Sequence, residues 1–349
     1  MQRRWLGLPL IGSLLLAAPS SSYGQSLELV GSIPGPATNV HIHADHAFVS
    51  HGPSLRIFDL TDPATPRPAG SFSFPQEVRG VRVSGSVAYV AIDFDGLALL
   101  DISDPTAPSQ LATIETPGQA LSVAVSGTTV VVTNRLSGLE IIDASNPSTP
   151  AAHGAYFAEG YAIDVDASGS FAYVVDTPGG LSIVDLSESG EVEARATQGT
   201  TEPSAAVAVT TLESKDGTVR TIAGLMSADS LLELFDVTDP SRPVTVGTYR
   251  NTDRQRPSTG GFAGAAATVG LVRVRMQGQL AYVTDAYPPF QLQVVDVSAP
   301  ANPTPVVSYE PPGSPQDIAV SGSLVLLALR AGRDAPTDEP GVLVLRLSR

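Results

Sequence analysis

The pentapeptide Leu-Ser-Ile-Val-Asp at residues 181–185 decides the fold, because variants of it recur along the chain. Five other copies begin with leucine and end with aspartate, at residues 55–59, 97–101, 139–143, 232–236 and 292–296. A seventh copy, at residues 342–346, begins with valine and ends with Arg346. The final aspartates at positions 59, 101, 143 and 185 are each 42 residues apart, a period typical of solenoids and propellers.

The content of one period distinguishes between these two architectures. Residues 119–160 contain four short segments with strand character, at residues 120–126, 129–133, 139–143 and 151–156, and show no helical periodicity. A four-stranded antiparallel unit that repeats radially is a propeller blade. The sequence therefore predicts an all-β fold, a seven-bladed β-propeller.

The two ends of the chain predict how the ring closes. Residues 27–33 are similar to residues 66–72, which occupy the position of a fourth strand, and the chain stops just after the third strand of its last copy. We therefore expect the N-terminal strand to complete the last blade. Such closure leaves no open sheet edge between the first and last blades.

An Asx-Pro turn follows most of the pentapeptides. The turns are Asp62-Pro63, Asp104-Pro105, Asn146-Pro147 and Asp239-Pro240. Asx side chains bind nearby backbone amides, and proline presets the turn. Because these residues recur in blade after blade, we interpret them as structural and not catalytic.

The pentapeptides, their Asp-Pro turns and the Gly-Ser or Val-Ser-Gly hairpins resemble the LVIVD repeat family of bacterial and archaeal secreted or cell-surface proteins. The resemblance covers the chain from about residue 26 to its end and implies a β-propeller of mostly uncharacterised role. Two copies depart from the pattern. Glu188-Ser-Gly190 replaces the Asp-Pro turn in the fourth blade, and Arg346 replaces the last aspartate.

The N-terminus predicts export. Arg3 and Arg4 precede an apolar run at residues 5–18, and Ser22 and Gly24 place small residues before a cleavage point. We predict a secretory signal peptide at residues 1–24 and a single propeller domain at residues 25–349, periplasmic, on the cell surface or extracellular. The run is short for a transmembrane anchor. An uncleaved N-terminal anchor remains the alternative.

Composition excludes several classes of site and partner. The chain has no cysteine, so it has neither disulfides nor thiolate metal sites, and its formal charge of -15 disfavours nucleic acid and anionic lipid. An acidic surface also simply keeps an exported protein soluble. We expect a monomer that contacts a protein or glycan ligand at the cell envelope.

Three insertions interrupt the repeat, at residues 212–218, around 251–267 and at 331–340. The second and third belong to connections that open on one face of a propeller, where insertions often form the binding surface. The candidate binding residues there are Arg254, Arg256, Arg330, Arg333 and Asp334. The Gly-, Ser- and Ala-rich composition of the second insertion is equally typical of a plain linker.

Two sets of side chains are candidate metal ligands. Aspartates in second-to-third strand loops could hold calcium at the channel mouth, namely Asp93, Asp95, Asp176 and Asp285. His41 and His43 share one face of a strand and could bind zinc or copper. The simpler interpretation is that the aspartates cap turns and the histidines line the channel. No cofactor is required by the sequence.

No catalytic motif is present: neither a Gly-x-Ser-x-Gly elbow, a His-Glu-x-x-His pair nor a phosphate loop. The leading hypothesis is an exported, non-enzymatic binding or scaffolding propeller. The alternative is a metal-assisted hydrolase or lactonase-like propeller with an acidic channel mouth. A stable structural module without a small-molecule site is a third possibility.

Overall fold

A computed structural model describes residues 24–135, 137–177, 180–214, 217–227, 230–250, 272–285, 290–330 and 340–348. The predicted signal peptide lies outside the described residues, apart from Gly24. Four of the predicted binding residues also lie outside them, namely Arg254, Arg256, Arg333 and Asp334.

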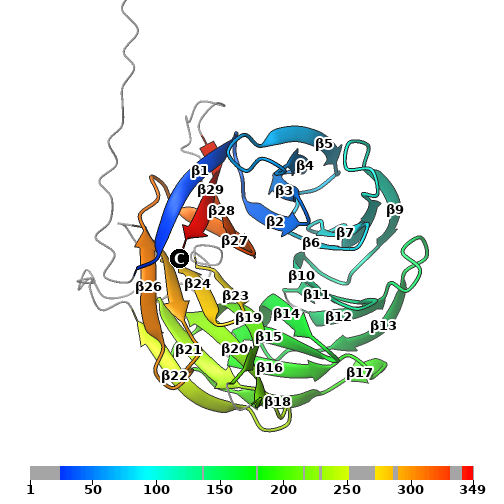
Figure 1. The fold of residues 1–349 in the computed structure, drawn as a ribbon. Helices are drawn as coiled ribbons and strands as arrows, with labels where there is room; N and C mark the ends of the chain where they lie inside the picture. Colours follow the sequence, from blue (N-terminus) through cyan, green and yellow to red (C-terminus); the bar gives the residue numbers. More distant parts are fainter. Residues whose placement is uncertain are drawn as a thin grey trace, which may run out of the picture.

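Seven sheets form a ring around a central axis, each with four antiparallel strands and one of them with an additional fifth strand (Figure 1), which confirms the predicted propeller. Blade 1 holds β2 (Asn39–His43), β3 (His46–His51), β4 (Ser54–Asp59) and β5 (Arg67–Ser73). Blade 2 holds β6 (Gly80–Ser84), β7 (Val87–Ala91), β8 (Leu97–Asp101) and β9 (Ser109–Ile114). Blade 3 holds β10 (Ala120–Ser126), β11 (Thr129–Asn134), β12 (Gly138–Asp143) and β13 (Ala151–Tyr156).

The second half of the ring follows the same plan. Blade 4 holds β14 (Tyr161–Ser168), β15 (Phe171–Thr177), β16 (Gly180–Asp185) and β18 (Ala194–Gln198). Blade 5 holds β19 (Ser204–Glu213), β20 (Val219–Ser227), β21 (Leu231–Asp236) and β22 (Val244–Arg250). Blade 6 holds β23 (Val274–Gln277), β24 (Leu280–Thr284), β25 (Leu292–Asp296) and β26 (Thr304–Tyr309).

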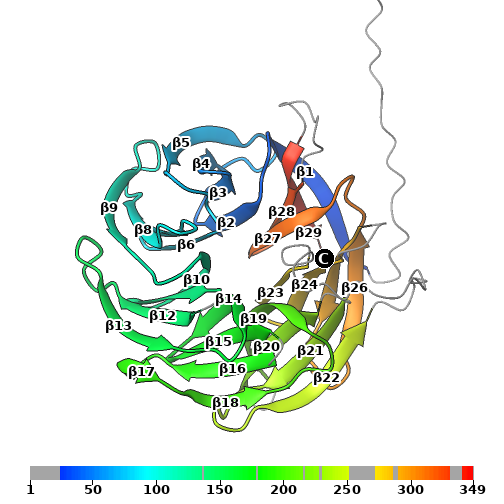
Figure 2. The same ribbon diagram turned by 180° about the vertical axis from the view of Figure 1, so that it is seen from behind.

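Blade 7 is shared by the two ends of the chain. Its strands are β27 (Pro315–Ser321), β28 (Leu324–Leu329) and β29 (Pro340–Ser348), and β1 (Ser26–Pro34) completes it as the outermost strand. In the antiparallel register, Leu27 lies opposite Leu347 and Ile33 opposite Val342. Both views of the ring show β1 beside β29 (Figures 1 and 2). The predicted closure by the N-terminal strand is confirmed.

Blade 4 departs from the plan where its pentapeptide lacks the Asp-Pro turn. The longer connection between β16 and β18 forms an extra strand, β17 (Gly190–Val192), which pairs in parallel with β13 of blade 3. Arg195 holds the base of this loop, since its Nη2 lies 2.9 Å from Asp185 Oδ2 and 2.6 Å from Glu188 Oε1. Without a proline to end pairing, the loop adds a strand to its neighbour.

The core lies between the blades. Aliphatic side chains on the faces of adjacent sheets pack against each other, as Leu55 and Ile57 of blade 1 do in one cluster with Val81, Val90 and Leu100 of blade 2. These five side chains are at most 1% exposed. Strands covered on both faces explain why the pentapeptides are almost continuously apolar.

The Asx residues of the Asx-Pro turns bind the backbone N two residues later, as predicted, and these residues are Asp62, Asp104, Asn146 and Asp239. The final aspartates of the pentapeptides form the same contact. Asp59 Oδ1 accepts hydrogen bonds from the backbone N and the Oγ1 of Thr61, at 2.7 and 2.6 Å. These bonds favour the ionised carboxylate and lower the pKa of Asp59. The same contact to the residue two positions later is formed by Asp101, Asp143, Asp185, Asp236 and Asp296.

A second recurring contact joins neighbouring blades along their outer strands. A Cβ atom at Gly70 in β5 would overlap the backbone carbonyl oxygen of Pro105, which lies in the Asp-Pro turn of blade 2. Gly31 meets the carbonyl of Pro63 in the same way, and Gly247 meets that of Pro300. In blades 1, 2 and 6 the turn after the third strand therefore packs closely against a glycine in the outermost strand of the preceding blade.

The first insertion lengthens one hairpin, as the sequence indicates. Strands β19 and β20 remain paired out to Glu213 and Val219. The extra residues thus extend blade 5 beyond its neighbours and do not form a separate unit. In the described part of the chain, no helix has the length and apolar character needed to cross a bilayer.

Candidate functional site at the channel mouth

The first strands of the blades surround the axis of the ring and enclose a cavity of 330 Å³ at one end of the channel. All seven blades contribute to its wall. The lining residues are Thr38, Asn39, His51, Gly52, Glu77, Val78, Arg79, Gly80, Arg82, Leu121, Ser122, Ile163, Asp164, Ala205, Arg273, Arg275, Gln316 and Asp317.

The cavity lies on the face where the connections between blades run. Most of its lining residues are in the first half of a first strand or in the connection before it, while His51 ends β3 and Gly52 lies in the loop that follows β3. The second and third insertions were predicted on this same face. Their described flanks agree, because one insertion is followed by β23 and the other joins β28 to β29.

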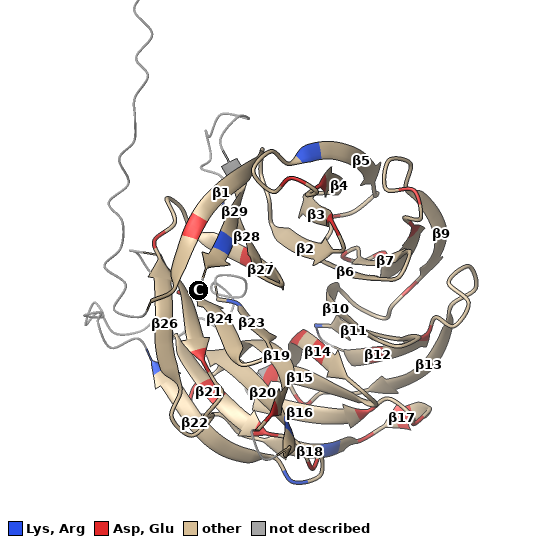
Figure 3. Cartoon of the chain, in the orientation of Figure 1, with Lys and Arg blue, Asp and Glu red and all other residues tan. Residues whose placement is uncertain are grey.

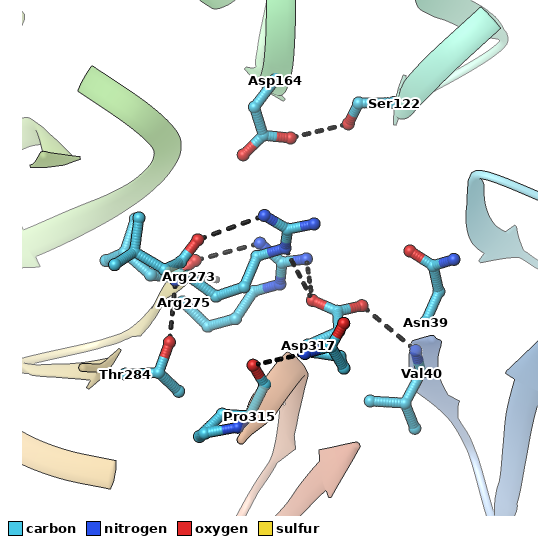
Figure 4. A network of polar contacts seen from close by, with 12 residues as sticks. Asn39, Val40, Ser122, Asp164, Arg273, Arg275, Thr284, Pro315 and Asp317 are labelled. Atoms are coloured by element: carbon cyan, nitrogen blue, oxygen red, sulfur yellow. Dashed lines mark hydrogen bonds and ion pairs between the residues drawn. The ribbon is translucent and has the colours of Figure 1, made fainter. Parts of the chain in front are cut away.

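Two arginines of β23 and the nearby chain share one carboxylate (Figure 4). Asp317 Oδ1 lies 3.1 Å from Arg275 Nη2 and 3.5 Å from Arg273 Nε, while Oδ2 accepts a hydrogen bond from the Val40 backbone N at 3.1 Å. Asp317 is 4% exposed and the two arginines about one-fifth exposed. This carboxylate therefore joins blade 7 to blades 6 and 1.

Asp164 on β14 performs the corresponding task on the opposite wall. Its Oδ1 accepts a hydrogen bond from Ser122 Oγ at 2.7 Å, and its Oδ2 accepts one from the Val207 backbone N at 3.1 Å. Two residues further along the strand, Asp166 Oδ2 accepts a hydrogen bond from the Val209 backbone N at 2.8 Å. The two aspartates of β14 thus fasten blade 4 to blade 5, and Asp164 also fastens it to blade 3.

Arg82 on β6 differs from the paired arginines. Its guanidinium donates a hydrogen bond to the Val81 carbonyl at 2.9 Å, and within the described residues it forms no ion pair. Enclosure in the channel lowers the pKa of Arg82, and the charge of Arg275 lowers it further, while the channel carboxylates oppose both effects. Arg82 and Arg275 therefore lie near each other, and of these two only Arg275 is paired with a carboxylate among the described residues, that of Asp317.

His41 lies on β2, the first strand of blade 1, and is not among the residues that line the cavity. Burial lowers its pKa well below the usual value, and the charges of Arg82, Arg275 and His43 lower it further. The imidazole is therefore neutral at pH 7.

The predicted calcium ligands belong to different blades, with Asp93 and Asp95 between β7 and β8, Asp176 within β15 and Asp285 just after β24. Asp93 Oδ2 is 3.1 Å from Arg79 Nη2, Asp176 Oδ1 accepts a hydrogen bond from the Gly160 backbone N at 3.0 Å, and Asp285 Oδ1 accepts one from Ser230 Oγ at 2.9 Å.

Asp95 lies two residues after Asp93, and none of the four aspartates lines the cavity. Across the described ranges, no three His, Asp or Glu side chains come together in a group that could hold a metal ion. Calcium and zinc sites, the latter at His41 and His43, stay predictions.

Of the predicted binding residues, Arg330 alone is described. It is exposed at the end of β28, and its backbone N donates a hydrogen bond to the Ser314 carbonyl at 2.8 Å.

The sequence interpretation missed the charged wall of the cavity. Arg82, Asp164, Arg275 and Asp317 each stand in the first strand of a blade, where the neighbouring residues are mostly apolar. Charges in the innermost strand of a propeller can only face the channel or the core. Alignment of the first strands of the repeats would have found them.

Comparison with known proteins supports the fold. No curated protein matches the chain. Among solved structures, the β-propeller domain of Cps50 (Swd1) from Myceliophteria thermophila has a TM-score of 0.65 at 13% identity, covering 93% of this chain and 100% of that one. The RRP9 WD40 repeats have a TM-score of 0.67 at 12% identity, with 95% and 99% covered. A chain of the Mitotic Checkpoint Complex has a TM-score of 0.64 at 13% identity, with 100% and 99% covered.

The repeats themselves match a known family. The LVIVD repeat is found at residues 76–116, 117–157, 159–191 and 272–310, which correspond to blades 2, 3, 4 and 6. The chain is therefore a seven-bladed β-propeller that carries LVIVD repeats.

Proposed function

We propose that this chain is an exported, non-enzymatic binding propeller that holds a glycan or protein ligand of the cell envelope at its channel mouth. The observation that carries the proposal is the 330 Å³ cavity to which all seven blades contribute. Its volume is within the range of about 300–1,000 Å³ that is usual for small-molecule sites. A site on first strands has a rigid frame, because each strand is paired within its blade and packed against the next.

The side chains of the cavity favour binding over catalysis. Both oxygens of Asp164 and both oxygens of Asp317 accept hydrogen bonds from neighbouring blades. A general acid or base must instead be able to exchange its proton with a substrate. Both carboxylates join neighbouring blades, and Asp317 also orients Arg273 and Arg275.

Exposed aromatic side chains on the same face also support binding. Phe94 lies in the loop between β7 and β8, Phe157 follows β13, and Tyr161 begins β14. Their exposed fractions are 67%, 58% and 48%, which is high for side chains that normally avoid water. Aromatic rings of this kind are enriched in protein interfaces, and their flat apolar faces suit the C–H face of a sugar. The likeness to WD40 propellers, one of them from a protein complex, is consistent with a scaffold role.

The proposal is tested with the chain from residue 25 onward. Isothermal titration against neutral and acidic envelope oligosaccharides should show saturable binding, and product analysis should show the sugars and a panel of lactones unchanged. Turnover that EDTA abolishes would instead favour the metal-assisted hydrolase. Export is tested by fractionating cells that express residues 1–349 and by measuring the mass of the product, which should lack residues 1–24.

A further inference from the structure

Hydrogen-bond donors exceed acceptors in the channel cavity. Four arginines and three carboxylates line it, and each oxygen of Asp164 and Asp317 already accepts a hydrogen bond from the protein. The guanidinium groups are less occupied. Arg82 donates to one backbone carbonyl, and Arg275 donates to the Val274 carbonyl and to Asp317. Each guanidinium carries several further N–H groups, so the centre of the cavity offers unused donors.

The unused donors also carry charge. Arg82 faces the field of Arg275 without an ion pair of its own among the described residues, and a guanidinium does not lose its proton under ordinary conditions. Asp317, Asp166 and Asp164 offset part of the charge of Arg82, but none of them forms an ion pair with it among the described residues. A ligand anion between these two arginines would supply a directly paired charge, and the planar guanidinium matches a carboxylate through paired hydrogen bonds.

Neutral groups around the arginines indicate the rest of the ligand. Asn39 uses its Nδ2 to donate to Ser50 Oγ and the Val78 carbonyl, so its Oδ1 is left to accept from a hydroxyl. Figure 4 shows the Asn39 side chain across from Arg273 and Arg275, and all three residues line the cavity. Leu121 and Ile163 add apolar wall beside these polar groups. A small molecule with hydroxyls, a carboxylate and a C–H face fits this combination.

We propose that the channel cavity binds a polyhydroxylated carboxylate, a uronic acid or sugar acid at the end of an acidic glycan, with its carboxylate between Arg82 and Arg275. The inference rests on the proposed binding function and names the ligand class for the same site. It also explains how a chain of net charge -15 can attract an anion. Acidic residues are spread around the ring (Figure 3), whereas the cavity gathers four arginines.

The test uses residues 25–349 and isothermal titration with glucuronate and galacturonate. Glucose and galactose serve as matched neutral sugars, and inorganic phosphate serves as a competing anion. We expect the uronates to bind at least about tenfold more tightly than the neutral sugars, because a charge-assisted pair adds more than about 1.4 kcal/mol. Arg82→Gln should lose this preference. Arg82→Lys, which keeps the charge but not the paired geometry, should retain part of it.

Arg242→Gln is the control, because Arg242 is 84% exposed in a turn and lies outside the cavity. It should bind uronates like the unmodified protein. Circular dichroism and thermal melts establish that the Arg82 variants fold. Arg82→Lys keeps the positive charge that faces Asp317, Asp166 and Asp164, so its melt should stay close to that of the unmodified protein.

The outcomes separate the two proposals. Equal affinity for glucose and glucuronate, or an unchanged uronate affinity in Arg82→Gln, would overturn the carboxylate site while leaving a binding propeller in place. Tighter binding of phosphate than of either uronate would overturn it in favour of a simple oxyanion site. If no acidic or neutral sugar bound, the carboxylate site would be overturned, and so would the proposal that the channel mouth holds a glycan.

Discussion

Replacement of Gly70 by alanine tests how the blades are held together. Gly70 lies in the outermost strand of blade 1, and an added methyl would overlap the carbonyl oxygen of Pro105 in blade 2. To restore van der Waals contact the oxygen must move by about 1 Å. The obstacle is backbone in a proline-containing turn, so no side-chain rotation relieves it.

Two opposing effects set the size of the change. Alanine in a strand is favoured over glycine by about 0.5–1 kcal/mol, because glycine loses more conformational entropy on folding. Overpacking against a fixed neighbour costs about 1–3 kcal/mol. The balance is a net loss of about 1–2 kcal/mol, which corresponds to a lowering of Tm by roughly 1.5–3 °C in a protein of this size.

Differential scanning fluorimetry at constant protein concentration measures this shift. Gly199→Ala is the matched control, because its φ is not in the left-handed region and no atom lies within 4 Å of the added Cβ. Its Tm should stay the same or rise slightly. If Gly70→Ala melted at or above the temperature of Gly199→Ala, the contact between turn and strand would not restrain the blades.

Ring closure, the neutral His41 and the buried Glu233 each lead to a further measurement. Deleting residues 26–33 removes buried side chains that each stabilise the fold by about 1.5–3 kcal/mol, and it exposes the edge of β29. The melting temperature should therefore fall by several degrees. An unchanged melting temperature would contradict closure of the ring by β1. The pKa of His41 is lower in the folded protein than the 6.5 of an unfolded histidine, so the unfolded chain binds a proton first and the free energy of unfolding should fall as the pH drops below about 6.5. In His41→Asn the melting temperature should therefore depend less on pH between pH 8 and 5. A pH dependence equal to that of the unmodified protein would refute this. Glu233→Ala leaves the Thr201 N–H and hydroxyl without their acceptor, so the free energy of unfolding in urea should fall by about 1–3 kcal/mol. Glu213→Ala, at an exposed position, should change it little. Equal urea midpoints for the two variants would show that the buried contact does not stabilise the fold.

The sequence was sufficient for the architecture because the fold repeats. The 42-residue spacing of the final aspartates, the four strand segments per period and the similarity of residues 27–33 to a fourth strand predicted seven blades and their closure. The sequence also predicted the hydrogen bonds within the turns. Asp59 and its equivalents bind amides two residues away, a distance along the chain over which sequence patterns are readable.

The site could not be found in the same way, because its contacts join distant parts of the chain. Asp317 binds the backbone of Val40, 277 residues away, and pairs with Arg275 of another blade. The closed ring determines which charged side chains come together in the channel, and residues adjacent in the sequence do not indicate these contacts. The extra strand β17 was missed for a related reason, since its partner β13 belongs to the preceding blade.

Closure through blade 7 has a consequence for the order of events in the cell. Among the described strands β1 is synthesised first, and it pairs with β29, which is synthesised last of them. Blades 1 to 6 can form as the chain emerges, but β1 must wait until β29 has been made. During that interval β1 is an unpaired strand that β29 of another molecule could capture, which would link two rings by exchange of their first strands. Slow synthesis or crowding of nascent chains would therefore favour such linked dimers, while a short delay between the two ends favours single rings.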